Sequence, residues 1–181
     1  MAGQILDGRE KQVYAPQTAG ILFRPGDVAD FISSKSTCIM KIAIGSDHAG
    51  FEYKQEILAY LRSLGHEVED FGTHSTDPVS YVLPVRAVAR AVAGGIHERG
   101  IVLGGSGNGE AMAANRVRGI RCGLCWNEES ARLTRAHNDA NVLSLGQRMM
   151  DRAMAISIVL VFLTTPFEGG RHQERIRQLD D

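Results

Sequence analysis

A glycine-rich stretch that ends on an acidic residue carries the residue types most suited to chemistry. Residues 104–109 read Gly-Gly-Ser-Gly-Asn-Gly, follow the apolar run Ile101-Val102-Leu103, and lead into Glu110 and a helix-forming segment. Glycines let the backbone turn sharply and bring N–H groups close to a ligand, and the start of a helix adds unpaired donors with a partial positive charge. We therefore expect an anion-binding loop with a carboxylate beside it.

A carboxylate next to such a loop favours proton abstraction from a substrate whose developing negative charge the loop then holds. The stretch lacks the Gly-Lys-Ser/Thr ending of a P-loop, so a nucleoside triphosphate is not indicated. A plainer interpretation is a helix N-terminus with a favourable acid in its first turn. On this stretch alone, both interpretations stay open.

The sequence around the loop alternates between short apolar runs and helical patterns from residue 40 onward. Besides the helix after the loop, strands are predicted at residues 41–46, 67–71, 100–104, 120–126 and 141–145, and helices at residues 51–64, 81–93, 128–137, 151–163 and 167–179. This alternation is typical of an α/β protein with a parallel sheet that helices cover on both faces.

Ligands bind at the carboxyl ends of the strands in such a sheet, so polar residues just after each strand should meet in one crevice. The candidates are Asp47 and His48, the loop with Ser106 and Glu110, His137-Asn138-Asp139, and Gly146-Gln147-Arg148. Arg171 and Arg175 lie four residues apart on one predicted helix face, and their planar forks of donors suit a phosphate.

Each candidate also has a purely structural interpretation. Asp47 precedes a predicted helix and fits a helix cap, and the histidines each fit a satisfied structural role. The two arginines fit a solvated helix face on which Glu168 and Glu174 balance the charge. The shared position of the candidates at strand ends favours the functional interpretation for the group.

Composition and charge disfavour several classes of partner. The 181 residues fit one domain, and the 20 basic and 21 acidic residues nearly cancel, so we expect neither a nucleic-acid nor a membrane partner. The apolar residues 153–163 are too few to cross a hydrocarbon core of about 30 Å as a helix. We expect no secretory signal and a cytoplasmic location.

The three cysteines, Cys38, Cys122 and Cys125, are predicted to be buried and structural, in a reducing compartment. No second Cys/His pair is spaced to complete a zinc site, and in a strand over residues 121–126 the last two thiols would point to opposite faces. Carboxylates and histidines show no clustering at metal-ligand spacing either, so we expect no metal and no cofactor.

Five motifs in a fixed order resemble ribose-5-phosphate isomerase type B and its relatives that isomerise other phosphorylated sugars. They cover about residues 40–177 and read Gly45-Ser46-Asp47-His48-Ala49-Gly50-Phe51, Gly105-Ser106-Gly107-Asn108-Gly109-Glu110 with Ala113-Ala114-Asn115, Arg135-Ala136-His137-Asn138-Asp139-Ala140-Asn141, Gly146-Gln147-Arg148, and Phe167-Glu168-Gly169-Gly170-Arg171-His172. The resemblance implies a Rossmann-like three-layer α/β/α sandwich with a five-stranded parallel sheet. It also implies a homodimer whose active sites are each built from two subunits, and it leaves a dimer of dimers open.

The resemblance further implies where a phosphorylated sugar binds. The phosphate is held by His48, Arg148, Arg171 and Arg175. The sugar lies beside Asn138, Tyr81 and the loop residues Gly105, Gly107, Asn108 and Gly109.

The catalytic residues are implied in the same way. Asp47 and His137 assist opening of the furanose ring. Part of the family uses a cysteine as the base at the position of Gly104, but this chain resembles the branch in which a glutamate, here Glu110, takes the proton with Ser106 as its hydroxyl partner.

These roles fit an aldose–ketose isomerisation, which moves a proton from C2 to C1 through an enediolate. The reaction needs one base that reaches both carbons and donors for the oxyanion, without a metal. Ribose 5-phosphate is the leading substrate. Because Ser80-Tyr81-Val82 replaces the family's Asp-Tyr-Pro element, phosphosugars with four or six carbons stay open as substrates.

Two other functions remain as alternatives. A noncatalytic phosphosugar- or nucleotide-binding module would use the loop and the arginines without Glu110. An NAD-dependent oxidoreductase is disfavoured because the loop follows the third strand and Glu69-Asp70 is poorly placed to hold a ribose. Residues 1–39 lie outside the resemblance and are predicted to be an irregular extension or leader before the domain at residues 40–181.

Overall fold

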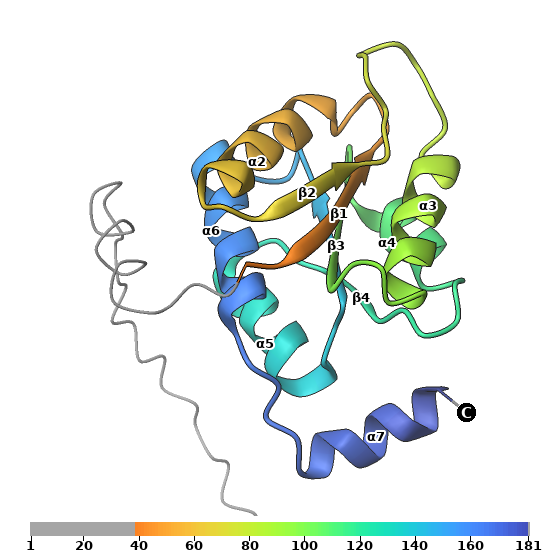
Figure 1. Cartoon of the computed structure of the whole chain (residues 1–181), viewed down its shortest axis with the longest axis vertical. Coiled ribbons are helices and arrows are strands. Elements are labelled where there is room, and N and C mark those ends of the chain that lie inside the picture. Colours follow the sequence, from red (N-terminus) through yellow and green to blue (C-terminus); the bar gives the residue numbers. More distant parts are fainter. Residues whose placement is uncertain (1–38, 181) are drawn as a thin grey trace, which may run out of the picture. The chain divides into compact units, whose positions relative to one another are not determined.

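Five parallel strands form one sheet in the computed structural model, which describes residues 39–180 (Figure 1). The strands are β1 (Lys41–Ser46), β2 (Glu67–Asp70), β3 (Arg99–Gly104), β4 (Cys122–Leu124) and β5 (Val142–Gly146). Their order is β2-β1-β3-β5-β4, and every neighbouring pair is parallel. The predicted parallel sheet is therefore confirmed.

Helices cover both faces of this sheet (Figure 1). They are α2 (Phe51–Ser63), α3 (Val82–Ala93), α4 (Asn108–Ala114), α5 (Glu128–Asn138), α6 (Arg152–Thr164) and α7 (Arg171–Asp180). One apolar core joins the sheet to α2, α5 and α6, and a second joins its other face to α3 and α4. The molecule thus has the predicted three layers, α/β/α.

The two cores follow from the alternation of side chains along each strand. In β1, Ile42 and Ile44 belong to the core under α2 and α6, whereas Ala43 between them belongs to the core under α3. The two described cysteines point to opposite faces as predicted, because Cys125 packs in the first core and Cys122 packs against the second. Cys125 is buried as predicted, whereas Cys122 is only half-buried. Burial raises the pKa of Cys125 to about 11, which fits the predicted structural role.

Two predicted elements differ from the structure by more than one residue at an end. The fourth strand spans only Cys122–Leu124, and the last helix begins at Arg171 rather than residue 167. In the preceding linker, the N–H of Glu168 donates to the carbonyl of Ala136 in α5 instead of joining a helix (2.9 Å). The prediction for residues 1–38, including Cys38, falls outside the described residues.

Helix α6 holds the apolar run and is packed into the first core through residues such as Ile158, Val159 and Phe162. Among residues 39–180, none of the helices combines the length and the apolar character that a membrane crossing requires.

Candidate active site

A cleft with a volume of about 370 Å³ opens at the carboxyl ends of β1, β3 and β5. Eight predicted site residues line it, and they are Asp47, His48, Tyr81, Gly105, Ser106, Gly109, Glu110 and Arg148. A hollow of about 490 Å³ lies along the edge strand β2, but acidic and basic side chains line it together and none of the predicted site residues is among them. The cleft at the strand ends is therefore the candidate site.

The glycine-rich loop follows β3 directly and leads into α4. Gly107 has φ +80°, and a Cβ atom there would lie 2.6 Å from Cδ1 of Leu124, so only glycine fits this turn. The hydroxyl of Ser144 in β5 donates to the carbonyl of Gly107 (2.7 Å), which ties the loop to the neighbouring strand. The loop is thus a fixed part of the sheet edge.

Glu110 lies in the first turn of α4 with only 4% of its surface exposed. Its carboxylate fills the space next to Gly104, where a Cβ atom would overlap it. Burial raises the pKa of Glu110, a bond from its own backbone N–H lowers it, and the charge of Asp47 raises it again. A buried carboxylate with a raised pKa beside donor groups suits a general base.

Asp47 and His48 come from the turn that follows β1. Oδ1 of Asp47 accepts from the N–H groups of Ala49 and Gly50 (2.9 and 3.0 Å), which closes the turn before α2. The N-cap of α2 is Gly50 and has no side-chain cap, so the interpretation of Asp47 as a helix cap is wrong. Asp47 also lines the cleft, and its charge acts on Glu110, which fits the functional interpretation. Nδ1 of His48 lies 3.2 Å from the backbone nitrogen of Val79.

Tyr81 reaches the cleft from the residue before α3. Its ring lies against Gly109, where a Cβ atom would be 2.7 Å from Cζ of the tyrosine. Arg148 enters from the turn after β5, and its backbone N–H donates to the carbonyl of Gly105 (3.1 Å). The loop residues Gly107 and Asn108 complete the predicted group at this edge of the sheet.

Four predicted residues, His137, Asn138, Arg171 and Arg175, lie elsewhere. Helix α5 ends at Asn138, and the carbonyl of Asn138 accepts a hydrogen bond from Nε of Arg121 (3.0 Å). Arg121 is the residue just before β4, so the end of α5 lies beside the amino end of that strand. This is the amino edge of the sheet, opposite to the cleft. The expectation that His137 joins the strand-end crevice within one chain is wrong, because a crossover helix carries the chain back to the amino ends of the strands.

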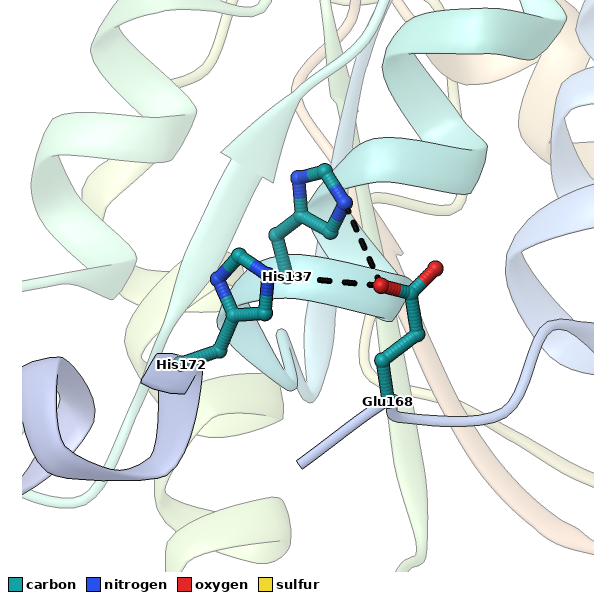
Figure 2. Close-up of side chains that lie close together, drawn as sticks. All are labelled: His137, Glu168 and His172. Atoms are coloured by element: carbon teal, nitrogen blue, oxygen red, sulfur yellow. Dashed lines mark ion pairs between the residues drawn. The ribbon is translucent and has the colours of Figure 1, made fainter. Parts of the chain in front are cut away.

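At that amino edge, three side chains gather that are up to 35 residues apart in sequence (Figure 2). The rings of His137 and His172 are stacked with centroids 4.3 Å apart, and Oε2 of Glu168 lies 3.5 and 4.0 Å from their Nε2 atoms. Burial is the main cause that lowers the pKa of His172, and the neighbouring His137 adds to it. The sequence prediction of no ligand cluster missed this group.

The two arginines on α7 are exposed. Glu174 pairs instead with Arg177 (3.2 Å), and Glu168 faces the histidines. Neither Arg171 nor Arg175 makes an ion pair with any of residues 39–180. The predicted solvated face is therefore present, but Glu168 and Glu174 do not pair directly with its arginines. Both guanidinium groups are available to an anion.

A buried lysine also went unnoticed in the sequence. Nζ of Lys54 in α2 donates to both carboxylate oxygens of Asp70 (2.6 and 2.8 Å) and to the carbonyl of Thr73 (2.5 Å). These bonds hold the segment after β2 in place. The carbonyl of Gly72 in this segment accepts a hydrogen bond from the N–H of Ser46, the residue before Asp47. A lysine within the apolar stripe of a predicted helix is the signal that would have identified it.

Known proteins resemble the chain over nearly all of its described part. The family model described as Ribose/Galactose Isomerase matches residues 42–179. "Ribose-5-phosphate isomerase B" of Mycolicibacterium paratuberculosis is 48% identical and covers 76% of this chain and 87% of its own. The protein of the same name from Escherichia coli is 45% identical, over 77% and 93% of the two chains.

Solved structures agree with this match. Ribose-5-phosphate isomerase B from Clostridium thermocellum superposes with a TM-score of 0.77 at 47% identity, over 78% of this chain and 95% of its own. The enzyme from Mycoplasma genitalium, solved with bound ribulose 5-phosphate, gives a TM-score of 0.75 at 37% identity, over 77% and 93%. The chain therefore belongs to the ribose/galactose isomerase family.

Proposed function

We propose that this protein is a cofactor-free aldose–ketose isomerase that converts ribose 5-phosphate to ribulose 5-phosphate. The observation that carries the proposal is the Glu110 carboxylate, buried against Gly104 at a loop rich in backbone donors. The names of the relatives support the substrate, since those at 45–48% identity are ribose-5-phosphate isomerases. The bound ribulose 5-phosphate in the Mycoplasma genitalium enzyme supports the product.

In this mechanism Glu110 removes the proton from C2 of the open-chain sugar and returns it to C1, while the hydroxyl proton on O2 passes to O1, so that the aldehyde at C1 becomes an alcohol and C2 becomes the ketone. The enediolate that forms between these steps carries its charge on oxygen, where the backbone N–H groups of residues 105–109 and the hydroxyl of Ser106 stabilise it. Such donors each contribute about 3–4 kcal/mol to lowering the barrier. The raised pKa makes Glu110 a stronger base than an exposed carboxylate, at the cost of a smaller ionised fraction.

The remaining roles require a second copy of the chain. Asp47 lines the same cleft as Glu110, whereas its proposed partner in ring opening, His137, lies at the opposite edge of the sheet. A homodimer that places the amino edge of one copy against the cleft of the other brings the two together. It also adds Asn138, Arg171 and Arg175 to the cleft's own His48 and Arg148 at the sugar and phosphate.

The phosphate-binding set is chemically consistent. Arg148 is exposed at the cleft, and Arg171 and Arg175 are exposed without an acidic partner among residues 39–180. Three such guanidinium groups, each with a planar fork of donors, suit a dianionic phosphate. Because Ser80-Tyr81-Val82 at the start of α3 replaces the family's Asp-Tyr-Pro element, we keep four- and six-carbon phosphosugars as substrates to be tested beside ribose 5-phosphate.

The test is conversion of ribose 5-phosphate in chelator-treated buffer by the wild type and by Glu110→Gln. We expect turnover in the wild type and a loss of several orders of magnitude in the variant, with little change in the affinity for the sugar phosphate. A wild type that binds the sugar phosphate but turns over neither it nor four- and six-carbon analogues would instead be a binding module. An active Glu110→Gln variant would remove Glu110 from the role of base.

A further inference from the structure

The three side chains at the end of α5 combine donor types that transition metals prefer. One ring nitrogen of His137, one of His172 and a carboxylate oxygen of Glu168 all lie within 4.8 Å of one another. Figure 2 shows the carboxylate pointing toward both imidazole rings from the linker between α6 and α7. Two imidazoles and one carboxylate are the ligand set of several zinc sites, which leave a fourth position open.

The backbone holds these three groups in place. The N–H of Glu168 donates to the carbonyl of Ala136, the residue before His137, and the N–H of His172 donates to the carbonyl of Gly169 (2.9 and 3.1 Å). The linker that carries Glu168 is therefore bonded at one end to α5 and at the other to the first turn of α7. Three ligands from three segments are fixed close together without any covalent link.

Metal binding requires the His137 ring to turn out of its stack on His172, because the lone pairs of two parallel rings run side by side and do not meet at one ion. Metal–ligand bonds of about 2 Å place the atoms of a tetrahedral site roughly 3.3 Å apart. The two nitrogen–oxygen distances of 3.5 and 4.0 Å are already close to that value. Glu168 is half exposed and His137 is one-third exposed, so both have room to rotate, whereas His172 is buried and stays fixed.

We propose that His137, Glu168 and His172 form a binding site for a divalent transition metal of the zinc class, and that the bound metal inhibits the enzyme. Inhibition follows because the metal occupies the imidazole lone pair that His137 needs to act on the sugar ring. This second half rests on the proposed function, whereas the binding site itself does not. Arg171 next to the site opposes a cation, so we expect a reversible, regulatory affinity rather than a permanent structural metal.

Calorimetric titration of the metal-free full chain with zinc chloride, in a buffer without phosphate, tests the site. We expect one zinc ion per chain in the wild type and at least a tenfold loss of affinity in Glu168→Gln, since even supporting residues change metal affinity by about 10- to 100-fold. Glu174→Gln, an exposed glutamate on α7 that faces Arg177, is the matched control and should bind zinc as the wild type does.

Cobalt(II) absorption spectra provide a second readout. Tetrahedral coordination gives intense visible bands, which we expect in the wild type and in Glu174→Gln and not in His172→Gln, after circular dichroism shows that the variant is folded. Absence of zinc binding by the wild type, or equal binding by Glu168→Gln, would overturn the proposed site.

Activity measurements separate this inference from the proposed function. We expect zinc to inhibit the wild type and Glu174→Gln, and at least tenfold more zinc to be needed for Glu168→Gln. If zinc binds but does not change turnover, the proposed inhibition is overturned, whereas the proposed binding site is still supported. If no phosphosugar is turned over, the proposed function fails, and the calorimetry still decides whether the site exists.

Discussion

The carboxylate of Glu110 occupies the space that a side chain on Gly104 would need. A Cβ atom built on Gly104 overlaps Oε1 of Glu110 and lies 2.7 Å from Oε2. A cysteine at position 104 and a glutamate at position 110 would therefore compete for one place at the end of β3. In the proposed mechanism, this overlap is the physical reason that position 104 holds a glycine while Glu110 serves as the base.

Gly104→Ala should lower kcat/KM for the phosphosugar by about 100-fold or more. The added methyl group displaces the carboxylate, and a displacement of about 1 Å at a reacting group costs about 100-fold in rate. Steady-state isomerisation assays measure this loss. A variant with wild-type kcat/KM would mean that the carboxylate does not act from the position it holds in the structure.

A double variant, Gly104→Ala with Glu110→Ala, is the control for folding. Removing the carboxylate makes room for the methyl group, so we expect the double variant to have a higher Tm than Gly104→Ala while remaining inactive. Equal Tm values for the two variants would show that the overlap is relieved in some other way.

The raised pKa of Glu110 predicts the acidic limb of the pH profile. The base must be ionised to accept a proton, so kcat/KM should fall as the pH drops through a pKa above the ordinary value of 4.5. Burial is the main cause of the shift, and Asp47→Asn removes a neighbouring charge that adds to it. The residual activity of that variant should therefore show its acidic limb at a lower pH.

Glu110→Gln should also be more stable than the wild type at neutral pH. Because the folded-state pKa is raised, the folded protein binds the proton more tightly than the unfolded chain, and stability falls as the pH rises through this window. The neutral amide does not carry that penalty. We expect the difference in Tm between variant and wild type to grow as the pH rises from the ordinary pKa of 4.5 through the raised pKa of the folded state, and then to stay constant.

The rule that ligands bind at the carboxyl ends of parallel strands predicted the residues of the cleft from the sequence. Asp47, Glu110 and Arg148 each follow a strand or its loop, and parallel strands bring such positions to the same edge whatever the details of packing. The elements themselves were predictable for the same reason, because apolar runs of strand length alternate with helical periodicity.

The group of side chains at the amino edge of the sheet could not be predicted, because it depends on how the elements are connected in space. The sequence predicts that His137 lies with the residues at the carboxyl ends of the strands. In the structure His137 lies at the end of α5, which runs back to the amino edge of the sheet. The contact of Glu168 with both histidines depends on the linker that leaves α6 and bonds to Ala136, and no periodicity predicts that path. Local patterns determine elements, whereas such contacts depend on how the elements are connected.

The arginines of α7 can be tested separately from the base. Arg171→Ala and Arg175→Ala should each raise KM or Kd for ribose 5-phosphate by about tenfold or more, because a hydrogen bond to a charged group contributes about 1.5–3 kcal/mol. Binding of unphosphorylated ribose should change little. Arg177→Ala is the matched control, since Arg177 lies on the same helix and pairs with Glu174. Equal losses for ribose and its phosphate would assign the two arginines to the fold or the dimer.

Mixing two inactive variants tests whether the active site is shared between two copies. Glu110 lies in the cleft and His137 at the opposite edge of the sheet, so in the proposed homodimer one site takes these residues from different chains. A mixed dimer of Glu110→Gln and His137→Ala chains then has one site with both native residues and one with neither. Co-refolding equal amounts should restore about a quarter of wild-type activity, because about half of the dimers are mixed and each has one working site. If both residues served a site within one chain, mixing would restore nothing, since every site would lack one of them.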